Sequence, residues 1–356
     1  MTNYNEEKQA VIEWLMHPNE LGCKPSKIEY TNEFVSEDGI RCIIFKFKKS
    51  LLSPWLLAIW SESGVFSEMK KYDASTEMDD ARELLAFLKQ YWINMAKAEE
   101  EREERATNAQ GFQAFVLLKD AKWNIEEFEK AFEEEWKITL NDHEGEAEDD
   151  DAGVSARVYE VGTMRLVLGY MDFAVPQEEA EWHAQFNYLW KEAVAVTKTH
   201  QAHILVTIMG EGTPEEKGTL YAKAIATLCQ QENTIGVYAN EVVYEPRYLL
   251  AVSELIHEGK LPMFSLIWFG LGREENGISA YTCGMRCFGK DEMEIVDSNK
   301  NPSELNDMLM AIAEYVITGD VILHDGETIG FSPEQRLKIV KSEGVNVDGD
   351  SLKIIY

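Results

Sequence analysis

Two cysteines near the C-terminus, Cys283 and Cys287, have side chains that could bind a metal ion or form a redox pair. We expect residues 278–288 to form a strand, in which positions four apart lie roughly 13 Å apart at about 3.3 Å per residue. A disulfide needs Cα atoms about 4.4–6.8 Å apart, so this spacing predicts no bridge. On a strand, both side chains would also share a face with Tyr281 and Met285, which is typical of a core. Buried structural thiols are therefore favoured over a metal site.

The segment from His324 to Glu327 places three titratable side chains within four residues, those of His324, Asp325 and Glu327. Acid–base catalysis would need these groups to converge within hydrogen-bonding distance of one substrate atom. Asp325-Gly326 is also typical of a tight turn, which explains both residues without a substrate. The turn is favoured. These three residues remain the weak catalytic candidates, and Arg286 is the candidate ligand-binding residue if it faces the same cleft.

Three histidines and one glycine-containing turn are further candidates, for a zinc site and a phosphate site respectively. His183 precedes His200 by about five turns of an expected helix, so these two and His203 do not predict a zinc site. The turn at residues 210–214 lacks the glycine spacing of the Rossmann and P-loop motifs, and Glu211 would repel a phosphate. The nucleophile elbow, the H-E-x-x-H helix and the kinase motifs do not occur in the sequence. No metal or cofactor is predicted, and a non-enzymatic protein is favoured without excluding an enzyme.

The composition is that of an acidic globular protein. The chain has 356 residues, of which 45% are hydrophobic and 11% aromatic, so it can bury substantial cores and form two or three domains. With 64 acidic and 34 basic residues, the formal net charge is −30. This balance argues against direct binding to nucleic acid or an anionic membrane, and it permits a basic protein partner.

The cysteine pattern and the hydropathy indicate where the protein is found. Five scattered cysteines and the lack of a secretory signal at the N-terminus predict reduced thiols in a cytoplasm. Apolar runs stay shorter than the roughly 18 residues that a transmembrane helix needs. We therefore expect a soluble cytoplasmic protein.

The first 107 residues predict a small α+β domain and a connector. Residues 1–94 are expected to contain a helix, a three-stranded meander and a second helix, at 6–16, 27–34, 40–48, 55–60 and 79–92. Residues 95–107 are polar on all sides, which is typical of a solvent-exposed helical linker.

The remaining residues predict two ferredoxin-like halves. Residues 108–234 are expected to contain strand, helix, two strands, helix and strand, with strands at 112–118, 137–140, 158–171 and 203–209 and helices at 124–136 and 176–199. A run with seven carboxylates, residues 142–151, interrupts this half and should be solvated. A helix starting at Thr213 follows. Residues 235–356 predict the same βαββαβ order, with elements at 235–238, 246–257, 263–288, 302–318 and 321.

Within this second half, residues 262–331 show the clearest local signals. Residues 262–270 are apolar on both faces and predict a strand, and Asn276-Gly277 predicts a hairpin turn to the strand at 278–288. Asn301, Pro302 and Glu304 predict a capping box at the start of a helix. Residues 321–331 predict a short strand that turns at Asp325-Gly326. The result is a packed α+β unit.

The run from Tyr281 to Gly289, the helix after it and the run from Gly319 to Gly330 resemble an uncharacterised bacterial family, DUF4261. The resemblance covers about residues 262–345, and the segment from about Phe112 resembles the family less closely. The resemblance implies the fold and a bacterial origin. The family has no activity or catalytic residues to transfer, so the resemblance implies no mechanism.

Two functions remain open from the sequence. The first is a non-enzymatic protein-binding module whose acidic surface is steered to a basic partner, for example as an immunity or antitoxin-like protein. The alternative is an enzyme or small-ligand binder that uses the crevice between the two C-terminal halves, because pockets often form between domains. The sequence does not indicate the oligomeric state.

Overall fold

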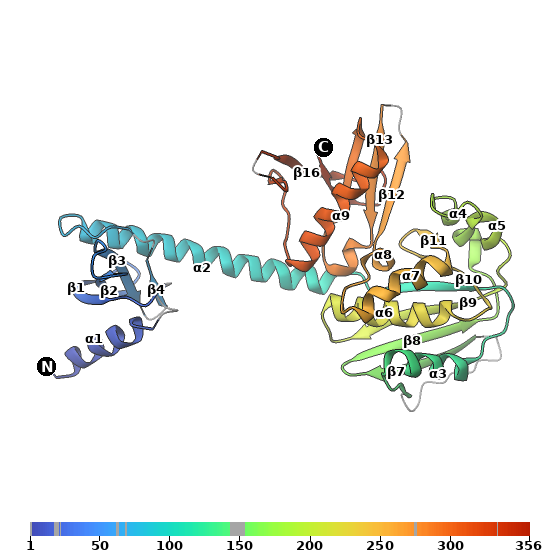
Figure 1. Ribbon diagram of the computed structural model, residues 1–356, viewed down its shortest axis with the longest axis horizontal. Helices are drawn as coiled ribbons and strands as arrows, with labels where there is room; N and C mark the ends of the chain where they lie inside the picture. Colours follow the sequence, from blue (N-terminus) through green and yellow to red (C-terminus); the bar gives the residue numbers. More distant parts are fainter. Residues whose placement is uncertain are drawn as a thin grey trace. The chain divides into compact units, whose positions relative to one another are not determined.

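The computed structural model describes residues 2–17, 21, 23–61, 64–67, 70–142, 154–273, 276–332 and 334–356. It has a mixed α+β fold, as the sequence predicted, and divides into two compact units, Met1–Glu103 and Glu104–Tyr356 (Figure 1). We call these the N-terminal and C-terminal units. The acidic run at residues 142–151 lies outside the described residues except for Asp142, and so do Glu274 and Glu275 of the expected hairpin turn.

The N-terminal unit is a four-stranded antiparallel sheet between two helices. The elements in chain order are α1 (Thr2–Leu15), β1 (Lys27–Val35), β2 (Arg41–Lys48), β3 (Leu56–Ser61), β4 (Gly64–Phe66) and α2 (Glu77–Asn108). Side chains alternate between the two faces of a strand. Ile43 and Phe45 of β2 therefore pack in a cluster with Leu15 of α1, whereas Cys42 and Ile44 pack with residues of α2. The expected order of helix, meander and helix is found, with β4 added.

The C-terminal unit contains a seven-stranded sheet, which we call the first sheet. Its order is β11-β10-β5-β9-β8-β7-β6, and the pairs are antiparallel. The strands are β5 (Gln113–Leu118), β6 (Asn141–Asp142), β7 (Val154–Val161), β8 (Met164–Met171), β9 (Ala202–Gly210), β10 (Thr234–Ala239) and β11 (Val242–Tyr244). Helices α3 (Ile125–Trp136), α6 (Pro214–Cys229) and α7 (Pro246–His257) supply side chains to the core on one face. Figure 1 shows α6 and α7 lying against this sheet.

The other face of the first sheet is covered by short helical segments, where one long helix was expected over residues 176–199. The segment forms η1 (Pro176–Glu178), α4 (Glu179–Ala184) and α5 (Ala193–Thr197). The side-chain oxygen of Asn187 accepts hydrogen bonds from the backbone N–H groups of Leu189 and Trp190 at 2.9 and 3.1 Å. Such a local bond competes with helical hydrogen bonding, so the continuous helix was a wrong expectation.

The ferredoxin-like halves are not confirmed. A split βαβ motif places two strands that are joined through a helix in parallel directions. In the first sheet β8 and β9 are joined through the helical segments η1, α4 and α5, yet they lie next to each other and pair antiparallel, in the order β5-β9-β8-β7. Strand β10, which was expected to open the second half at residue 235, pairs with β5 instead. The expected boundary between residues 234 and 235 therefore does not divide the two sheets, because the strands on both sides of it belong to the first sheet.

A six-stranded second sheet completes the C-terminal unit, with the order β12-β13-β14-β17-β16-β15. Its strands are β12 (Trp268–Arg273), β13 (Ile278–Cys283), β14 (Met293–Ser298), β15 (Thr328–Ile329), β16 (Leu337–Glu343) and β17 (Asp350–Ile354). The β14–β17 pair is parallel. Helix α9 (Pro302–Thr318) contacts β12, β13 and β14, and it begins with the predicted capping box of Asn301 and Glu304.

Three local expectations for this region need correction. Residues 263–266 form the short helix α8 (Met263–Leu266), so the expected strand at 262–270 covers only its second half. The strand expected to reach residue 288 ends at Cys283, because Gly284 has a φ of 122° and the helical turn η2 (Met285–Phe288) follows. Between residues 321 and 331, the strand is limited to Thr328–Ile329.

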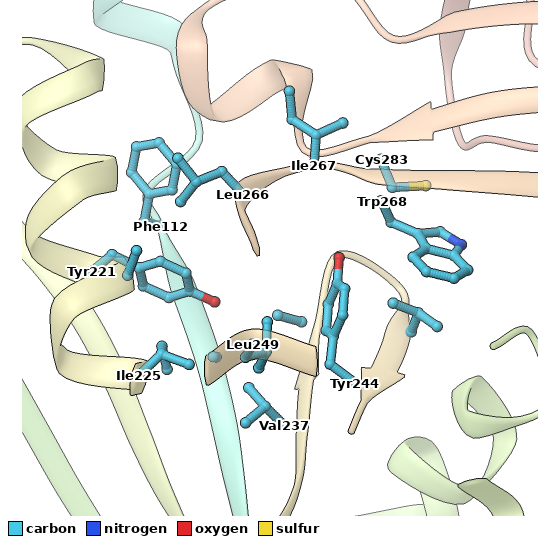
Figure 2. Packing of buried hydrophobic residues seen from close by; sticks show 14 of the residues in the cluster. Phe112, Tyr221, Ile225, Val237, Tyr244, Leu249, Leu266, Ile267, Trp268 and Cys283 are labelled. Carbon is cyan, nitrogen blue, oxygen red and sulfur yellow. The ribbon is translucent and has the colours of Figure 1, made fainter. Parts of the chain in front are cut away.

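Side chains from both sheets form one continuous hydrophobic core. Figure 2 shows Phe112 from the first-sheet side beside Leu266, and Tyr244 of β11 near Trp268 of β12. All of these residues are buried. In the described part of the chain, no helix is both long enough and apolar enough to cross a membrane.

Candidate ligand-binding pocket

A cavity of about 510 Å³ opens where the two sheets of the C-terminal unit meet. We call it the seam pocket. One wall comes from the segment before β5, from α6 and from the β10–β11 turn; the other comes from the end of β13, from η2 and from the loop between β16 and β17. The lining residues are Gln110, Gly111, Phe112, Gln113, Tyr221, Asn240, Glu241, Cys283, Gly284, Arg286, Cys287, Glu292, Val347 and Asp348.

The β10–β11 turn places Asn240 and Glu241 at the pocket. Ala239 pairs with Val242, so the hairpin has a two-residue loop, and both loop residues have positive φ values of 50° and 58°. Such a loop normally contains asparagine or glycine, and a glutamate there is strained. The Asn240 side chain donates to the Leu266 carbonyl at 3.1 Å, and the Glu241 carboxylate accepts from the Cys283 thiol at 3.7 Å. The strained turn is thus fixed to the opposite wall.

Glu292 is a buried carboxyl group that holds η2 in place. Its oxygens accept hydrogen bonds from the Thr282 hydroxyl at 2.7 Å and from the backbone N–H groups of Gly284 and Arg286 at 2.9 and 3.4 Å. Burial raises the pKa of Glu292, and these hydrogen bonds only partly oppose that effect. The sharp turn that ends β13 is therefore stabilised by a side chain from the chain segment just before β14.

Arg286 lines the pocket, but it does not share a cleft with His324, Asp325 and Glu327, which was the condition under which it was a ligand-binding candidate. Its Nη2 donates to the backbone carbonyls of Asp348 and Asp350, the second at 3.5 Å. Its own carbonyl accepts a hydrogen bond from the backbone N–H of Gln110 at 3.1 Å. Arg286 therefore connects η2 to the β16–β17 loop and to the segment that precedes β5.

The two cysteines of the pocket are protonated thiols. Cys283 ends β13 and Cys287 lies in η2, so they do not share a strand as expected, although both are unpaired. Burial raises the pKa of Cys283 well above its ordinary value and that of Cys287 to about 12. A thiol with a raised pKa is a weak nucleophile and a poor metal ligand. Among the residues that the structure describes, no cluster of side chains could hold a metal ion.

The structure places His324, Asp325 and Glu327 in a turn outside the seam pocket. The Glu327 carboxylate accepts a hydrogen bond from the His324 backbone N–H at 2.9 Å, and the Asp325 carboxylate accepts one from the Lys341 backbone N–H at 2.9 Å. These contacts fix the turn, whose Gly326 has a φ of 83°. The three side chains do not line the cavity that contains Arg286.

Of the pocket residues, the sequence singled out Arg286 as a ligand-binding candidate and Cys283 and Cys287 as buried thiols, and it did not indicate the others. Tyr221 lies on an apolar helix and was not distinguishable from core. Asn240 and Glu241 connect two short apolar strands, but no glycine marks the turn. No element was expected between residues 289 and 301, so nothing in the sequence distinguished Glu292, which lies just before β14.

The one family match found in the comparisons with known proteins covers mainly the pocket wall formed by the end of β13, η2 and the β16–β17 loop. Residues 281–355 match the family described as "Domain of unknown function (DUF4261)". The resemblance expected from the sequence is thus confirmed for the C-terminal region. The matched segment contains Arg286 and Glu292, whereas Tyr221 and Glu241 lie outside it. The searches of curated proteins and of solved structures gave no match.

Proposed function

We propose that this is a non-enzymatic binding protein whose C-terminal unit holds a ligand in the seam pocket. The observation that supports this proposal is the pocket itself. Its volume of about 510 Å³ suits a small ligand or a protruding side chain, and its polar groups come from both walls. This proposal takes up the crevice that was expected between the C-terminal halves, although the walls belong to two sheets with a different strand order.

The side chains of the pocket favour binding over catalysis. Both thiols have raised pKa values, so they are poor nucleophiles at neutral pH. The buried carboxyl group of Glu292 is already bonded to three donors of its own chain. No histidine is among the described lining residues, and His324 lies elsewhere. A general base near an activated nucleophile is therefore not found in the described pocket.

Gly111 offers a direct test, because a Cβ atom built at this position has no neighbour within 4 Å. A Gly111→Trp variant should fill the pocket without straining the backbone. We would screen small molecules against the full chain by thermal shift, and a pocket ligand should stabilise the unmodified protein but not this variant. Gln201→Trp, at an exposed position that does not line the cavity, is the matched control and should keep the response. Ligands that stabilise both variants equally would contradict the proposal.

A basic protein partner is the second candidate function, and the charge distribution favours it. Residues 104–356 account for −24 of the formal net charge of −30. An acidic surface of this kind steers basic partners and accelerates their association. An immunity or antitoxin-like role would be one form of this function.

Affinity capture at low and moderate salt tests this second candidate. Full chains with and without charge reversal at residues 142–151 would be compared. A basic protein held at low salt by the unmodified chain, and lost on charge reversal, would support it. The candidate fails if neither chain retains a basic protein.

A further inference from the structure

We propose that the seam pocket binds a cationic group, either an alkylammonium or a guanidinium. This inference rests on the proposed function of the pocket as a ligand site and names the chemistry of the ligand. It rests on the charges of the pocket, on a tyrosine hydroxyl that makes no hydrogen bond with the described residues, and on two aromatic rings.

The charged side chains of the pocket favour a cation. Glu241 and Asp348 line it with no basic side chain bonded to their carboxylates among the described residues. The lining has one cationic side chain, Arg286, and it donates to the backbone carbonyls of Asp348 and Asp350. Glu241 is held at the cavity by its strained turn and accepts only a weak bond from the Cys283 thiol. Both residues are exposed and neither carboxylate is bonded to a basic side chain of the described residues, so each is available to pair with a cation.

Tyr221 supplies an independent indication of a ligand. Its side chain is only 3% exposed and lines the cavity, yet its hydroxyl makes no hydrogen bond with the described residues. The hydroxyl oxygen is accessible from the cavity and is therefore free to form a hydrogen bond with a ligand. Burial raises the pKa of Tyr221, so this hydroxyl is neutral and can accept a hydrogen bond from an ammonium group. Figure 2 shows this hydroxyl extending from α6 into the region between the two sheets.

The aromatic side chains of the same wall suit a cation as well. Phe112 and Tyr221 both line the cavity, with ring centroids 5.8 Å apart. Aromatic faces attract ammonium and guanidinium groups through the ring quadrupole, and this attraction grows when the site excludes water. Carboxylates together with aromatic rings therefore select a cation with an apolar stem over an anion or a neutral polyol.

Calorimetric titration of the full chain tests this inference with size-matched probes. Butylammonium and butylguanidinium should bind, whereas butyrate and butanol should not. Glu241→Gln keeps the shape of the side chain and removes its charge, so it should weaken the binding of both cations by about two- to fivefold. Tyr221→Phe should weaken the binding of both cations several-fold. Glu258→Gln is the matched control, because Glu258 pairs with Lys260 away from the cavity, and it should not change binding.

Each outcome separates the two proposals. If butyrate binds as well as butylammonium, or if the cations bind equally well to Glu241→Gln, the cation inference is wrong. A neutral or anionic ligand that Gly111→Trp excludes would keep the proposed function and overturn the cation inference. If no probe or screened compound shows binding that Gly111→Trp abolishes, both fail.

Two further probes distinguish the source of the cation. N-acetyl-lysine methylamide represents a side chain of a partner protein, and putrescine represents a free amine. Binding of N-acetyl-lysine methylamide by the pocket supports a basic side chain as the ligand. Binding of putrescine alone supports a small-molecule cation.

Discussion

Replacing Glu294 with glutamine should destabilise the second sheet more than its small change in shape suggests. The carboxylate of Glu294 is fully buried and lies 2.6 Å from Nζ of Lys353. It also accepts hydrogen bonds from the Ser351 hydroxyl at 2.6 Å and from the backbone N–H groups of Val345 and Asn346, the latter at 2.6 Å. All of its partners are donors, so the amide nitrogen of a glutamine would face a donor whichever way it turned.

The expected magnitude follows from the loss of one partner in a buried ion pair. Breaking such a pair costs about 3–5 kcal/mol, because the remaining charge is left uncompensated. For a unit of this size, each kcal/mol lowers the midpoint of thermal unfolding by about 2–4 °C, so Glu294→Gln should lower it by roughly 6–20 °C. Scanning calorimetry of the full chain measures the shift, and hydrogen exchange of peptides from residues 337–354 assigns it to the second sheet.

The pH dependence gives this prediction a second test. Burial raises the pKa of Glu294, but the hydrogen bonds from Lys353, Ser351 and the backbone outweigh burial and hold the pKa below the ordinary 4.5. A carboxyl group with a lowered pKa stabilises the fold above its unfolded pKa, and this stabilisation is lost as the pH falls through the folded value. The difference between the natural protein and Glu294→Gln should therefore be largest at neutral pH and shrink below about pH 4.5.

Two variants complete the experiment. Glu294→Gln combined with Lys353→Met removes both charges, and it should recover much of the lost stability, since the cost comes from the unpaired ammonium group. Glu334→Gln, at an exposed position, should have no effect. A midpoint for Glu294→Gln within about 2 °C of the natural protein would refute the reasoning, since that corresponds to less than about 1 kcal/mol. A shift that is the same at every pH would refute it as well.

Three further perturbations test other parts of the structure. Gly270→Ala places a methyl group on the ring of Tyr281 in the neighbouring strand, so it should cost about 1–3 kcal/mol in urea unfolding; an unchanged midpoint would argue against this packing. Asn301→Ala removes the cap of α9 and should cost about 1 kcal/mol, whereas serine there should cost little; equal losses would contradict the capping role. Iodoacetamide should modify Cys23 before the buried Cys229, as peptide mass spectrometry can show, and the reverse order would contradict the described burial.

The sequence predicted best those elements whose signals are local. The capping boxes at Thr213 and Asn301 begin α6 and α9 where expected, because the cap side chain and its partner three residues later are specified by neighbours in the chain. The apolar run at residues 40–48 likewise predicted a strand, which the structure has as β2. In these places the pattern and the structure depend on the same few residues.

Features that depend on distant residues could not be predicted. The helix expected at 176–199 is interrupted because the Asn187 side chain donates to the carbonyl of Val243, which lies 56 residues further along the chain, and also bonds its own turn. Strand order likewise depends on long-range pairing, so a βαββαβ sequence of elements did not specify the order of the first sheet. The seam pocket combines residues from 110 to 348, and Arg286 was a candidate only if it shared a cleft with His324, Asp325 and Glu327, which it does not.

The shared core of the two sheets affects how this chain could be cut. The segment that matches the family begins at Tyr281, within β13. It leaves out β12 (Trp268–Arg273), the strand that pairs with β13. A fragment of residues 281–355 would keep only the last part of β13, from Tyr281 to Cys283. It would leave backbone N–H and C=O groups of β13 and β14 as an open edge, and it would expose the apolar face that the first sheet covers. Such a fragment should self-associate through that edge. For expression and crystallisation, the smallest cooperative piece is therefore expected to begin near Glu104.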